Sequence, residues 1–327
     1  MLGRFQSSGD LIADRRFLYA AAFLEDGDFA AAAELFEQAI EIAPEWTAAY
    51  WSLGKARRDA GDIARAAIAF RECLRLDPED LLGASLALAE IDASVTIDAA
   101  PQAYLKTLFD AYAEDFDSSL VERLDYATPQ QLAALVREAG RGETRYTRAL
   151  DLGCGTGLAG EAIINNVAWL EGVDLSDRMI EKARAKRIYD TLAAGDILTA
   201  LHSARGRYDL VIAADVLIYF GELEKIFAAI ARRLEFGGLV AFSVEKGEGA
   251  DRTLRASLRF AHSAEYVARV LKSSGLELVR MEERVLRKDR GEDIAGYLVL
   301  ARRPADGADR SLPADDGAMM DAPASLH

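Results

Sequence analysis

The sequence predicts two folded parts, an all-α helical repeat followed by an α/β domain whose parallel sheet closes in an antiparallel hairpin. Three observations predict this fold class. A 34-residue repeat occupies the first third of the chain, strand and helix patterns alternate from about residue 148, and a glycine-rich turn follows the first strand. The 327 residues are 51% hydrophobic, so each part can bury a core of its own.

The first third of the chain repeats itself with a period of 34 residues. The offset joins small, aromatic and turn positions, namely Gly27 and Gly61, Ala32 and Ala66, Phe36 and Phe70, Ala39 and Cys73, and Pro44 and Pro78. Two copies over about residues 11–78 resemble the tetratricopeptide repeat, with a covering helix from Leu81 to Ile91. We therefore expect a helical domain over residues 1–92. It either packs only on its own chain or binds a protein partner or a second copy.

A region of linker and lid helices is expected over residues 93–144. Residues 93–101 have the composition of a linker, and helical patterns follow at about 102–113, 116–125 and 129–139. Pro129 suits the first turn of the last of these helices. At the other end of the chain, residues 304–327 are rich in Ala, Asp, Gly and Pro and are expected to be disordered.

A seven-stranded sheet is predicted over residues 145–303. Strands are expected at about 148–152, 168–174, 191–194, 209–214, 239–244, 276–286 and 296–301, and helices at 157–165, 177–187, 223–234 and 263–274. This alternation implies a parallel sheet with helices on both faces. No helix fits between the last two strands, which a charged turn at 288–291 joins, so the final strand must run antiparallel.

The composition disfavours several classes of protein. A net charge of −15 disfavours a nucleic-acid partner, because proteins that grip phosphate backbones usually carry the opposite sign. Cys73 and Cys154 form neither a disulfide framework nor a metal spacing, which favours a reducing, cytoplasmic location. The N-terminus has no apolar signal core, and no apolar run approaches the ~20 residues of a membrane span. We therefore expect no membrane.

The turn after the first strand carries the most chemical information. Gly153, Gly155 and Gly157 alternate there, so a ligand can lie against bare backbone. Asp151 precedes them at the strand end, where a carboxylate would repel a pyrophosphate but attract an ammonium group. Asp174, at the end of the second strand, is placed to bind a ribose. This pattern favours S-adenosylmethionine over a dinucleotide.

Together these residues resemble the class I, seven-stranded S-adenosylmethionine-dependent methyltransferases, whose sheet is Rossmann-like. With the repeats, the chain resembles tetratricopeptide-repeat methyltransferases related to the type 11 and type 12 small-molecule enzymes. The resemblance implies that the three glycines line the methionine part, Asp151 contacts its amino group and Asp174 holds the ribose. It also implies adenine contacts from Leu175, Met179, Asp196 and Ile197, and a lid that includes Tyr112 and Phe116. Ordinary strand-end capping by the two later aspartates, and plain helix packing by the two aromatics, are the alternatives.

Absences narrow the methyl acceptor. The loop after the fourth strand, residues 214–219, lacks the Asp/Asn-Pro-Pro-aromatic motif of amino methyltransferases, and neither cysteine is placed as a nucleophile. No acid cluster follows that strand, so we expect no metal. A small molecule with a hydroxyl or carboxylate is favoured, for which a base helps.

The candidate catalytic residues are Asp215, Tyr219 and His262. His262 is expected to begin the last helix, after an insertion at 246–261 that could cap the acceptor, or else to be a helix-start residue with no role. Glu245, at the end of the fifth strand, could also orient an acceptor. The basic runs at 252–259 and 284–290 either attract an anionic acceptor or are simply solvated.

Three functions remain open at this point. The first is an enzyme that methylates a small molecule. The second is a methyltransferase whose repeats recruit a protein substrate, and the third is an interaction scaffold without turnover. The complete set from Asp151 to Asp196 argues against the third.

Overall fold

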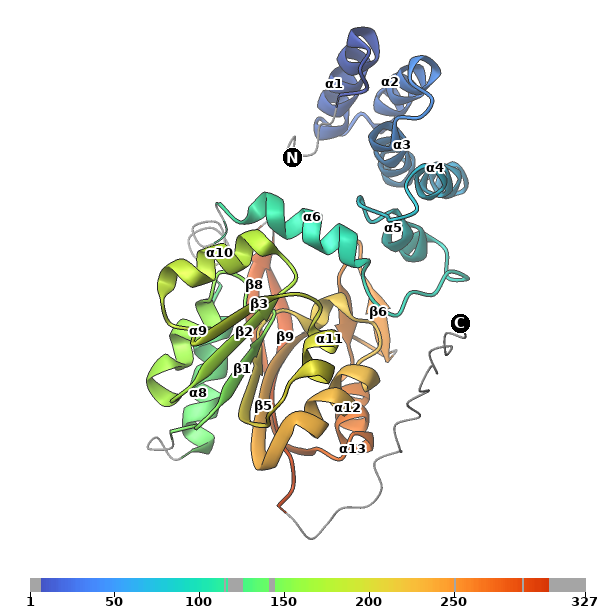
Figure 1. Cartoon of the computed structure of the whole chain (residues 1–327). Coiled ribbons are helices and arrows are strands. Elements are labelled where there is room, and N and C mark those ends of the chain that lie inside the picture. Colours follow the sequence, from blue (N-terminus) through green and yellow to red (C-terminus); the bar gives the residue numbers. More distant parts are fainter. Residues whose placement is uncertain are drawn as a thin grey trace, which may run out of the picture.

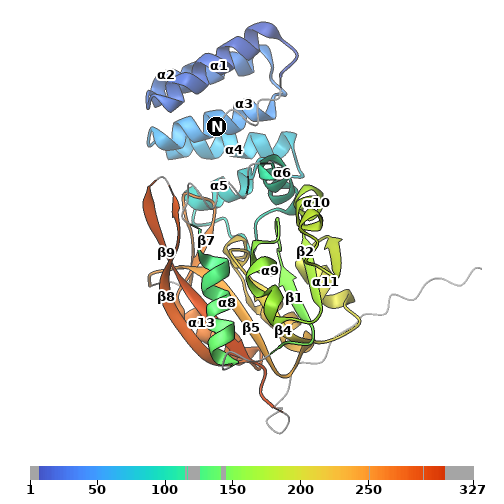
Figure 2. The same cartoon turned by 90° about the vertical axis from the view of Figure 1, so that its left-hand side faces the viewer.

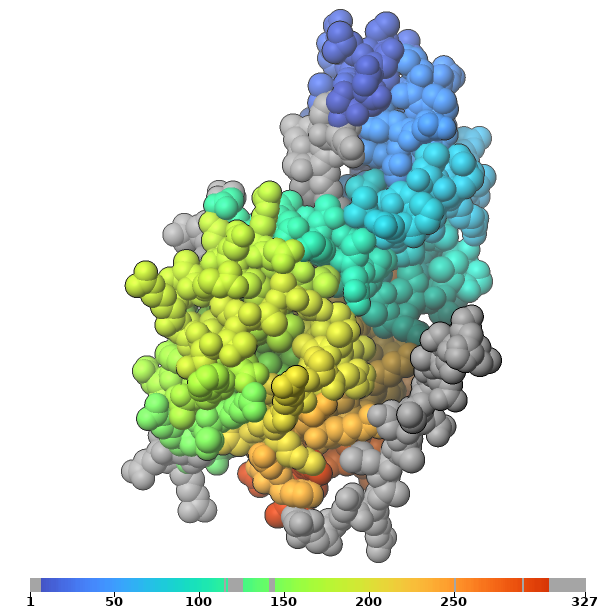
Figure 3. Space-filling view, viewed as in Figure 1, coloured from blue at the N-terminus to red at the C-terminus, as the bar shows by residue number. Residues whose placement is uncertain are grey.

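The structure is a computed structural model that describes residues 7–114, 116, 126–140, 145–249, 251–289 and 291–305. The helical repeats lie at one end of the sheet and project from it as an arm (Figure 1; Figure 3). The helix expected at 116–125 lies, apart from Phe116, outside the described residues, as does the expected tail from residue 306 onward. No helix in the described part of the chain is both long enough and apolar enough to cross a membrane.

Four helices form the two predicted repeats, and a fifth covers their end. The helices are α1 (Leu11–Glu25), α2 (Phe29–Ile42), α3 (Thr47–Asp59), α4 (Ile63–Leu76) and α5 (Ala84–Ile91). Asp28 and Asp62 cap α2 and α4, because each carboxylate accepts a hydrogen bond from a backbone N–H in the first turn. A Cβ at Gly54 would lie 2.5 Å from the Phe70 ring, so the helices approach closely only because this position has no side chain.

Seven strands form the predicted sheet, in the order β3-β2-β1-β4-β5-β9-β8. Their bounds are β1 (Ala149–Leu152), β2 (Leu170–Asp174), β3 (Thr191–Ala194), β4 (Tyr208–Ala213), β5 (Leu234–Lys246), β8 (Glu277–Asp289) and β9 (Glu292–Arg302). β9 runs antiparallel to both of its neighbours, β5 and β8, whereas the strands from β3 to β5 pair in parallel with one another. The predicted α/β fold with an antiparallel final hairpin is therefore confirmed.

Helices cover both faces of this sheet, as the alternating pattern predicted. One core joins the sheet to α8 (Thr128–Ala139) and α9 (Leu158–Ile163), and the other joins it to α11 (Ile197–Ser203), α12 (Glu224–Arg233) and α13 (Ala264–Ser273). Figure 2 shows α8 and α9 on the near face of the sheet. α6 (Gln102–Tyr112) packs on α10 (Asp177–Lys186), near the carboxyl ends of β1 and β2.

The insertion predicted to cap the acceptor contains a small hairpin, β6 (Arg252–Leu254) and β7 (Phe260–His262). β7 extends the edge of the sheet by pairing in parallel with the last two residues of β5. The prediction that His262 begins the last helix is wrong, because His262 is a strand residue and Ser263 caps α13. Strands of three residues are too short to produce a periodic sequence signal.

The end of the repeats and the sheet domain share one hydrophobic core. Phe70 and Leu86 from the helices belong to the same buried cluster as Tyr219 and Phe260. The expected linker takes part as well, because the Ala100 N–H donates a 2.8 Å hydrogen bond to the Tyr219 carbonyl. The loop after β4 is therefore stabilised by contacts with the repeats and with the segment that follows them.

Candidate active site

The glycine turn between β1 and α9 has the backbone that its sequence requires. Gly153, Gly155 and Gly157 have φ angles of 63°, 53° and 98°, in the left-handed region that other residues rarely adopt. A Cβ at Gly153 would lie 2.2 Å from a methyl carbon of Val216, so this position also needs the missing side chain. The turn thus exposes bare backbone at the carboxyl end of β1, where open α/β sheets bind ligands.

Asp151 lies beneath this turn as a buried acid with one free oxygen. Its exposed fraction is 0%, and its Oδ2 accepts a 2.7 Å hydrogen bond from the Tyr189 hydroxyl. Its Oδ1 is a buried acceptor without a partner among the described residues. Burial raises the pKa of Asp151 to about 7, while the Tyr189 hydrogen bond lowers it and the charge of Asp174 raises it further. An ammonium group would satisfy this oxygen.

Tyr189 was missed by the sequence analysis, although three glycines accommodate its ring. A Cβ would lie 3.1 Å from this side chain at Gly157, 2.3 Å at Gly160 and 2.9 Å at Gly172. Gly172 lies inside β2, where a glycine weakens a strand unless something packs closely against it. That glycine was the available signal, but it does not say which residue fills the space.

Asp174 joins the end of β2 to the glycine turn. It is 8% exposed, its Oδ2 accepts from the Gly155 N–H at 2.9 Å, and its Oδ1 accepts from the Ser176 N–H at 2.9 Å. Burial raises the pKa of Asp174, and the two backbone hydrogen bonds act against this shift. α6 is tied to the same place, because the Ser176 hydroxyl donates to Asp110 at 2.5 Å. Asp110 and Ser176 were not predicted.

The residues expected around the adenine lie on two neighbouring elements. Met179 is fully buried in α10, and Leu175, in the loop after β2, packs against the buried cluster that contains Phe70 and Tyr219. Asp196 caps α11, because its Oδ1 accepts from the N–H and the hydroxyl of Thr199 at 2.8 and 3.0 Å. Ile197 is 6% exposed in the first turn of that helix. Capping is thus present at Asp196, and an adenine contact stays a prediction.

Of the two expected lid aromatics, Phe116 lies against the glycine turn. Its ring is 3.7 Å from the position of a Cβ on Gly155. Phe109 of α6 continues the contact, with its ring centroid 6.3 Å from that of Phe116 and 5.6 Å from that of Tyr219. Tyr112 is 44% exposed at the end of α6. An aromatic chain therefore runs from the turn to the loop after β4.

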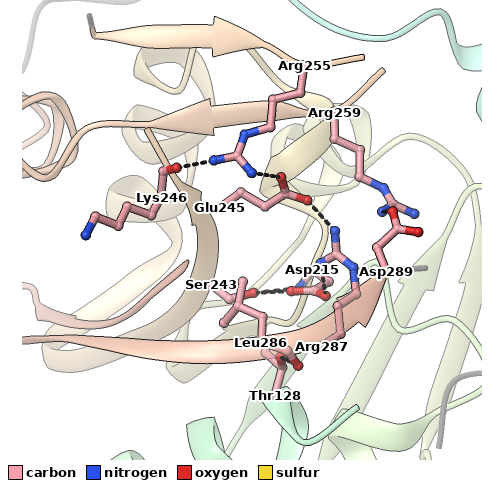
Figure 4. Close-up of polar contacts among 10 residues, drawn as sticks. All are labelled: Thr128, Asp215, Ser243, Glu245, Lys246, Arg255, Arg259, Leu286, Arg287 and Asp289. Atoms are coloured by element: carbon pink, nitrogen blue, oxygen red, sulfur yellow. Dashed lines mark hydrogen bonds and ion pairs between the residues drawn. The ribbon is translucent and has the colours of Figure 1, made fainter. Parts of the chain in front are cut away.

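Asp215, in the loop after β4, is held in a strained backbone conformation. Its φ is 54°, which costs energy for a residue with a side chain. Its N–H donates to Ser243 Oγ at 2.8 Å, and the Ser243 hydroxyl donates back to Asp215 Oδ1 at 2.8 Å. Arg287 donates to Asp215 Oδ2 at 2.8 Å (Figure 4). The carboxylate is therefore fixed from both sides.

Arg287 is the centre of a buried ion network that the sequence analysis did not predict. Its side chain is 3% exposed and donates to both Asp215 and Glu245, and Arg255 pairs with Glu245 at 3.4 Å (Figure 4). Burial acts to lower the pKa of Arg287, but the charges of Asp215 and Glu245 raise it overall. The network joins the carboxyl ends of β4 and β5 to β8.

Tyr126 connects this network with the glycine turn. Burial raises the pKa of its phenol well above the usual range, and the charges of Asp215, Arg287 and Asp151 all act on it. One side chain thus lies within electrostatic reach of Asp151 under the turn and of Asp215 after β4. Tyr219, 8% exposed, is a further neighbour of the same phenol. Asp151, Asp215 and Tyr219 therefore each lie within electrostatic reach of Tyr126.

His262 is not brought to this group by the structure. Its ring is fully buried, and its Nε2–H donates a 2.9 Å hydrogen bond to the Phe220 carbonyl. The strongest charged neighbours of the ring are Arg252 and Glu224. This geometry supports a residue that holds the loop after β4. Contact of His262 with a methyl acceptor stays a prediction.

The buried histidine makes a stability prediction. Burial lowers the pKa of His262 to about 4, against a value of ~6.5 in the unfolded chain. The unfolded chain binds more protons between these values, so the contribution of His262 to stability is complete above pH ~6.5 and is lost as the pH falls toward 4. Between pH 7 and pH 5 we expect a loss of about 2 kcal/mol. Urea unfolding at both pH values should show a smaller loss for His262→Gln, and an equal loss in both proteins would refute the assignment.

Among the described residues, no three or more His, Cys, Asp or Glu side chains are grouped so that they could hold a metal ion.

Both parts of the chain contain segments that match known protein families. Residues 149–238 match the methyltransferase domain family, and residues 13–45 and 47–80 match the tetratricopeptide repeat. Two ubiquinone biosynthesis O-methyltransferases are 29% (Thiobacillus denitrificans) and 33% (Burkholderia lata) identical to 38% of this chain. The chain spans 53% of the length of each.

Two solved structures have similar folds. Magnesium protoporphyrin IX methyltransferase from Synechocystis PCC 6803, solved with S-adenosylmethionine, is 18% identical, with a TM-score of 0.47 over 62% of this chain and 96% of that one. The N-methyltransferase NodS from Bradyrhizobium japonicum WM9, solved with S-adenosylhomocysteine, is 25% identical, with a TM-score of 0.43 over 54% and 85%.

Proposed function

Because the chain carries a methyltransferase domain of the S-adenosylmethionine-dependent class behind two tetratricopeptide repeats, we propose that it methylates a hydroxyl or carboxylate oxygen of a small molecule. The observation that carries the proposal is Asp151, whose buried free oxygen lies under the glycine turn. The naming of two relatives as O-methyltransferases supports an oxygen acceptor.

In this proposal, one group of residues binds S-adenosylmethionine and another group binds the methyl acceptor. S-adenosylmethionine, when bound, supplies a methyl group already activated on a sulfonium. Asp151 would hold its amino group and Asp174 its ribose, while Phe116 covers the turn and excludes water. Asp215 and Tyr219 would orient the acceptor, and this alignment alone can supply several kcal/mol.

Labelling of a fractionated cell extract tests this function. The full-length protein is incubated with extract and with S-adenosylmethionine that carries a labelled methyl group. We expect label in small molecules, and at a limiting concentration of cofactor we expect much slower labelling when Asp174→Ala replaces the wild type. Label that enters only protein would favour the recruiting alternative. Tight binding of a nicotinamide dinucleotide, measured by calorimetry, would refute the cofactor assignment.

The raised pKa of Asp151 makes cofactor binding depend on pH. An ammonium group prefers the ionised acid, so the affinity for S-adenosylmethionine should rise with pH up to about 7. Between pH 5 and pH 6 we expect an increase of roughly tenfold. Calorimetric titration should show this slope for the wild type and a nearly flat response for Asp151→Asn. Parallel slopes in the two proteins would contradict the assignment.

The repeats are the basis of a second candidate function, recruitment of a protein substrate or of a second copy. α1 exposes large apolar side chains on its outer side, at Leu11, Ile12, Leu18, Tyr19 and Phe23. Apolar patches of this kind are uncommon on isolated monomers. The repeats would then present the methyltransferase domain to a protein.

Tyr19→Glu tests this role of α1. We expect the full-length wild type to elute from size-exclusion chromatography, with light scattering, as a dimer or with a co-purifying protein, and Tyr19→Glu as a monomer. Ile68→Glu in α4 is a matched control, because both side chains are 59% exposed. A monomeric wild type without a bound protein would leave the repeats packing only on their own chain.

We also propose a cytoplasmic location, supported by the cysteines. Cys73 and Cys154 are both free and buried. Burial raises the pKa of the Cys73 thiol to about 12 and that of Cys154 well above its usual range, so both stay protonated and unreactive.

A further inference from the structure

Three arginines from the two basic runs, Arg255, Arg259 and Arg287, lie near the candidate acceptor-binding residues Asp215 and Tyr219. Arg287 donates to both Asp215 and Glu245, and Arg255 donates to the Lys246 carbonyl and pairs with Glu245, which is buried. Arg259 differs from them (Figure 4). Among the described residues its carboxylate partner is Asp289, at the loose distance of 3.6 Å. A guanidinium has five N–H donors, and Arg259 also makes a hydrogen bond with Tyr219, so these two partners among the described residues leave further donors for a ligand.

Arg259 lies next to the expected acceptor position. Burial acts to lower the pKa of its guanidinium, but Tyr219 and Glu245 outweigh this, so the group stays charged. Tyr219 is also the end of the aromatic chain that begins at the glycine turn. The side chain of Arg259 is 29% exposed, which leaves it accessible to a ligand.

Asp289 is a partner that can be displaced. Its side chain is 40% exposed at the tip of β8, and its distance of 3.6 Å to Arg259 exceeds that of a good charged hydrogen bond. A partly exposed ion pair of this kind contributes little stability. An anion that binds Arg259 more strongly can therefore displace Asp289, whose carboxylate is then hydrated by water.

We propose that Arg259 binds an oxyanion of the methyl acceptor, a carboxylate or a phosphate, in place of Asp289. This inference rests on the proposed function and names the class of its substrate. The planar guanidinium matches two oxygens of either group. Arg255, Arg259 and Arg287 balance Asp215, Glu245 and Asp289 in charge, so exchanging Asp289 for an oxyanion keeps that balance.

The charge pattern also selects against other acceptors. A neutral acceptor would leave Arg259 with its loose partner and gain nothing from it. A cationic acceptor would be repelled by Arg259 at the position proposed for the oxyanion. The methylated oxygen would therefore belong to a molecule that carries a negative charge a short distance away.

Binding of two simple anions to the full chain loaded with S-adenosylhomocysteine tests this proposal. Inorganic phosphate and benzoate are titrated at constant ionic strength, and the melting temperature gives a dissociation constant for each. We expect saturable stabilisation of the wild type by at least one anion. Arg259→Gln should bind that anion at least tenfold more weakly, and Arg259→Lys should be intermediate. Asp289→Asn should bind it several-fold more tightly, because the competitor is gone.

Arg252→Gln is the matched control, since Arg252 lies in the same hairpin and pairs instead with Glu222. It should bind the anion like the wild type. The proposal is overturned if neither anion binds the wild type, or if Arg259→Gln and Arg252→Gln respond alike. Calorimetry of S-adenosylhomocysteine is independent of Arg259. If the wild type does not bind S-adenosylhomocysteine, the proposed function is refuted. If it binds S-adenosylhomocysteine normally but binds neither anion, only this inference is refuted.

Discussion

Arg287→Met is expected to lower the free energy of unfolding by about 3–5 kcal/mol, because it leaves the buried carboxylate of Glu245 and the largely buried carboxylate of Asp215 without their shared cation. Among the described residues, Asp215 would keep Ser243 as its side-chain partner, and Glu245 would keep its 3.4 Å pair with Arg255. Urea denaturation at pH 7.5 measures the effect.

A control and a rescue make this prediction specific. Arg284→Met, on the same strand but with a side chain that is 52% exposed, should change stability by less than about 1 kcal/mol. Adding Asp215→Asn and Glu245→Gln to Arg287→Met should restore part of the loss, since the unpaired charges are removed. A loss below 1 kcal/mol for Arg287→Met would show that the network is not a stabilising centre.

Asp174→Ala is expected to weaken S-adenosylmethionine binding ten- to a hundred-fold, which corresponds to ~1.5–3 kcal/mol. The change removes the proposed acceptor for the ribose hydroxyls, and it also leaves the N–H of Gly155 without its hydrogen bond to Asp174. Calorimetric titration of the full chain gives the dissociation constants.

Asp177→Asn is the matched control for this change. It lies three residues further along the chain, with a side chain that is 68% exposed and paired with Lys106. Its affinity should stay within about twofold of the wild type. If Asp174→Ala binds the cofactor as tightly as the wild type, the ribose assignment is wrong.

The fold was predictable where the sequence signal comes from residues that are close together in the chain. The 34-residue repeat, the βα alternation and the final hairpin are all periodic signals, and each is present in the structure. The glycine turn was equally local, because Asp151 and its three glycines lie within seven residues. The β6–β7 hairpin was not predicted, because its two strands pair over only three residues each and give no periodic pattern.

The missed residues act across long sequence separations. The hydrogen bond from Tyr189 to Asp151 spans 38 residues, and that from Arg287 to Asp215 spans 72. Strict strand alternation would place Arg287 on the same side as Val285, which is 44% exposed. A break in the β8–β9 register between these two residues turns Arg287 inward instead. Such an irregularity leaves no mark in the pattern of a basic run.

The core shared by the repeats and the sheet domain has a thermodynamic consequence. Phe70 and Leu86 lie in the same buried cluster as Tyr219 and Phe260, so both parts of the chain contribute to one core. The boundary between the two sequence families is therefore not a boundary between cooperative units. A truncation at residue 92 exposes apolar surface on both fragments. A partner that binds the folded repeats adds its binding free energy to the stability of the shared core, and therefore to that of the loop that holds Tyr219.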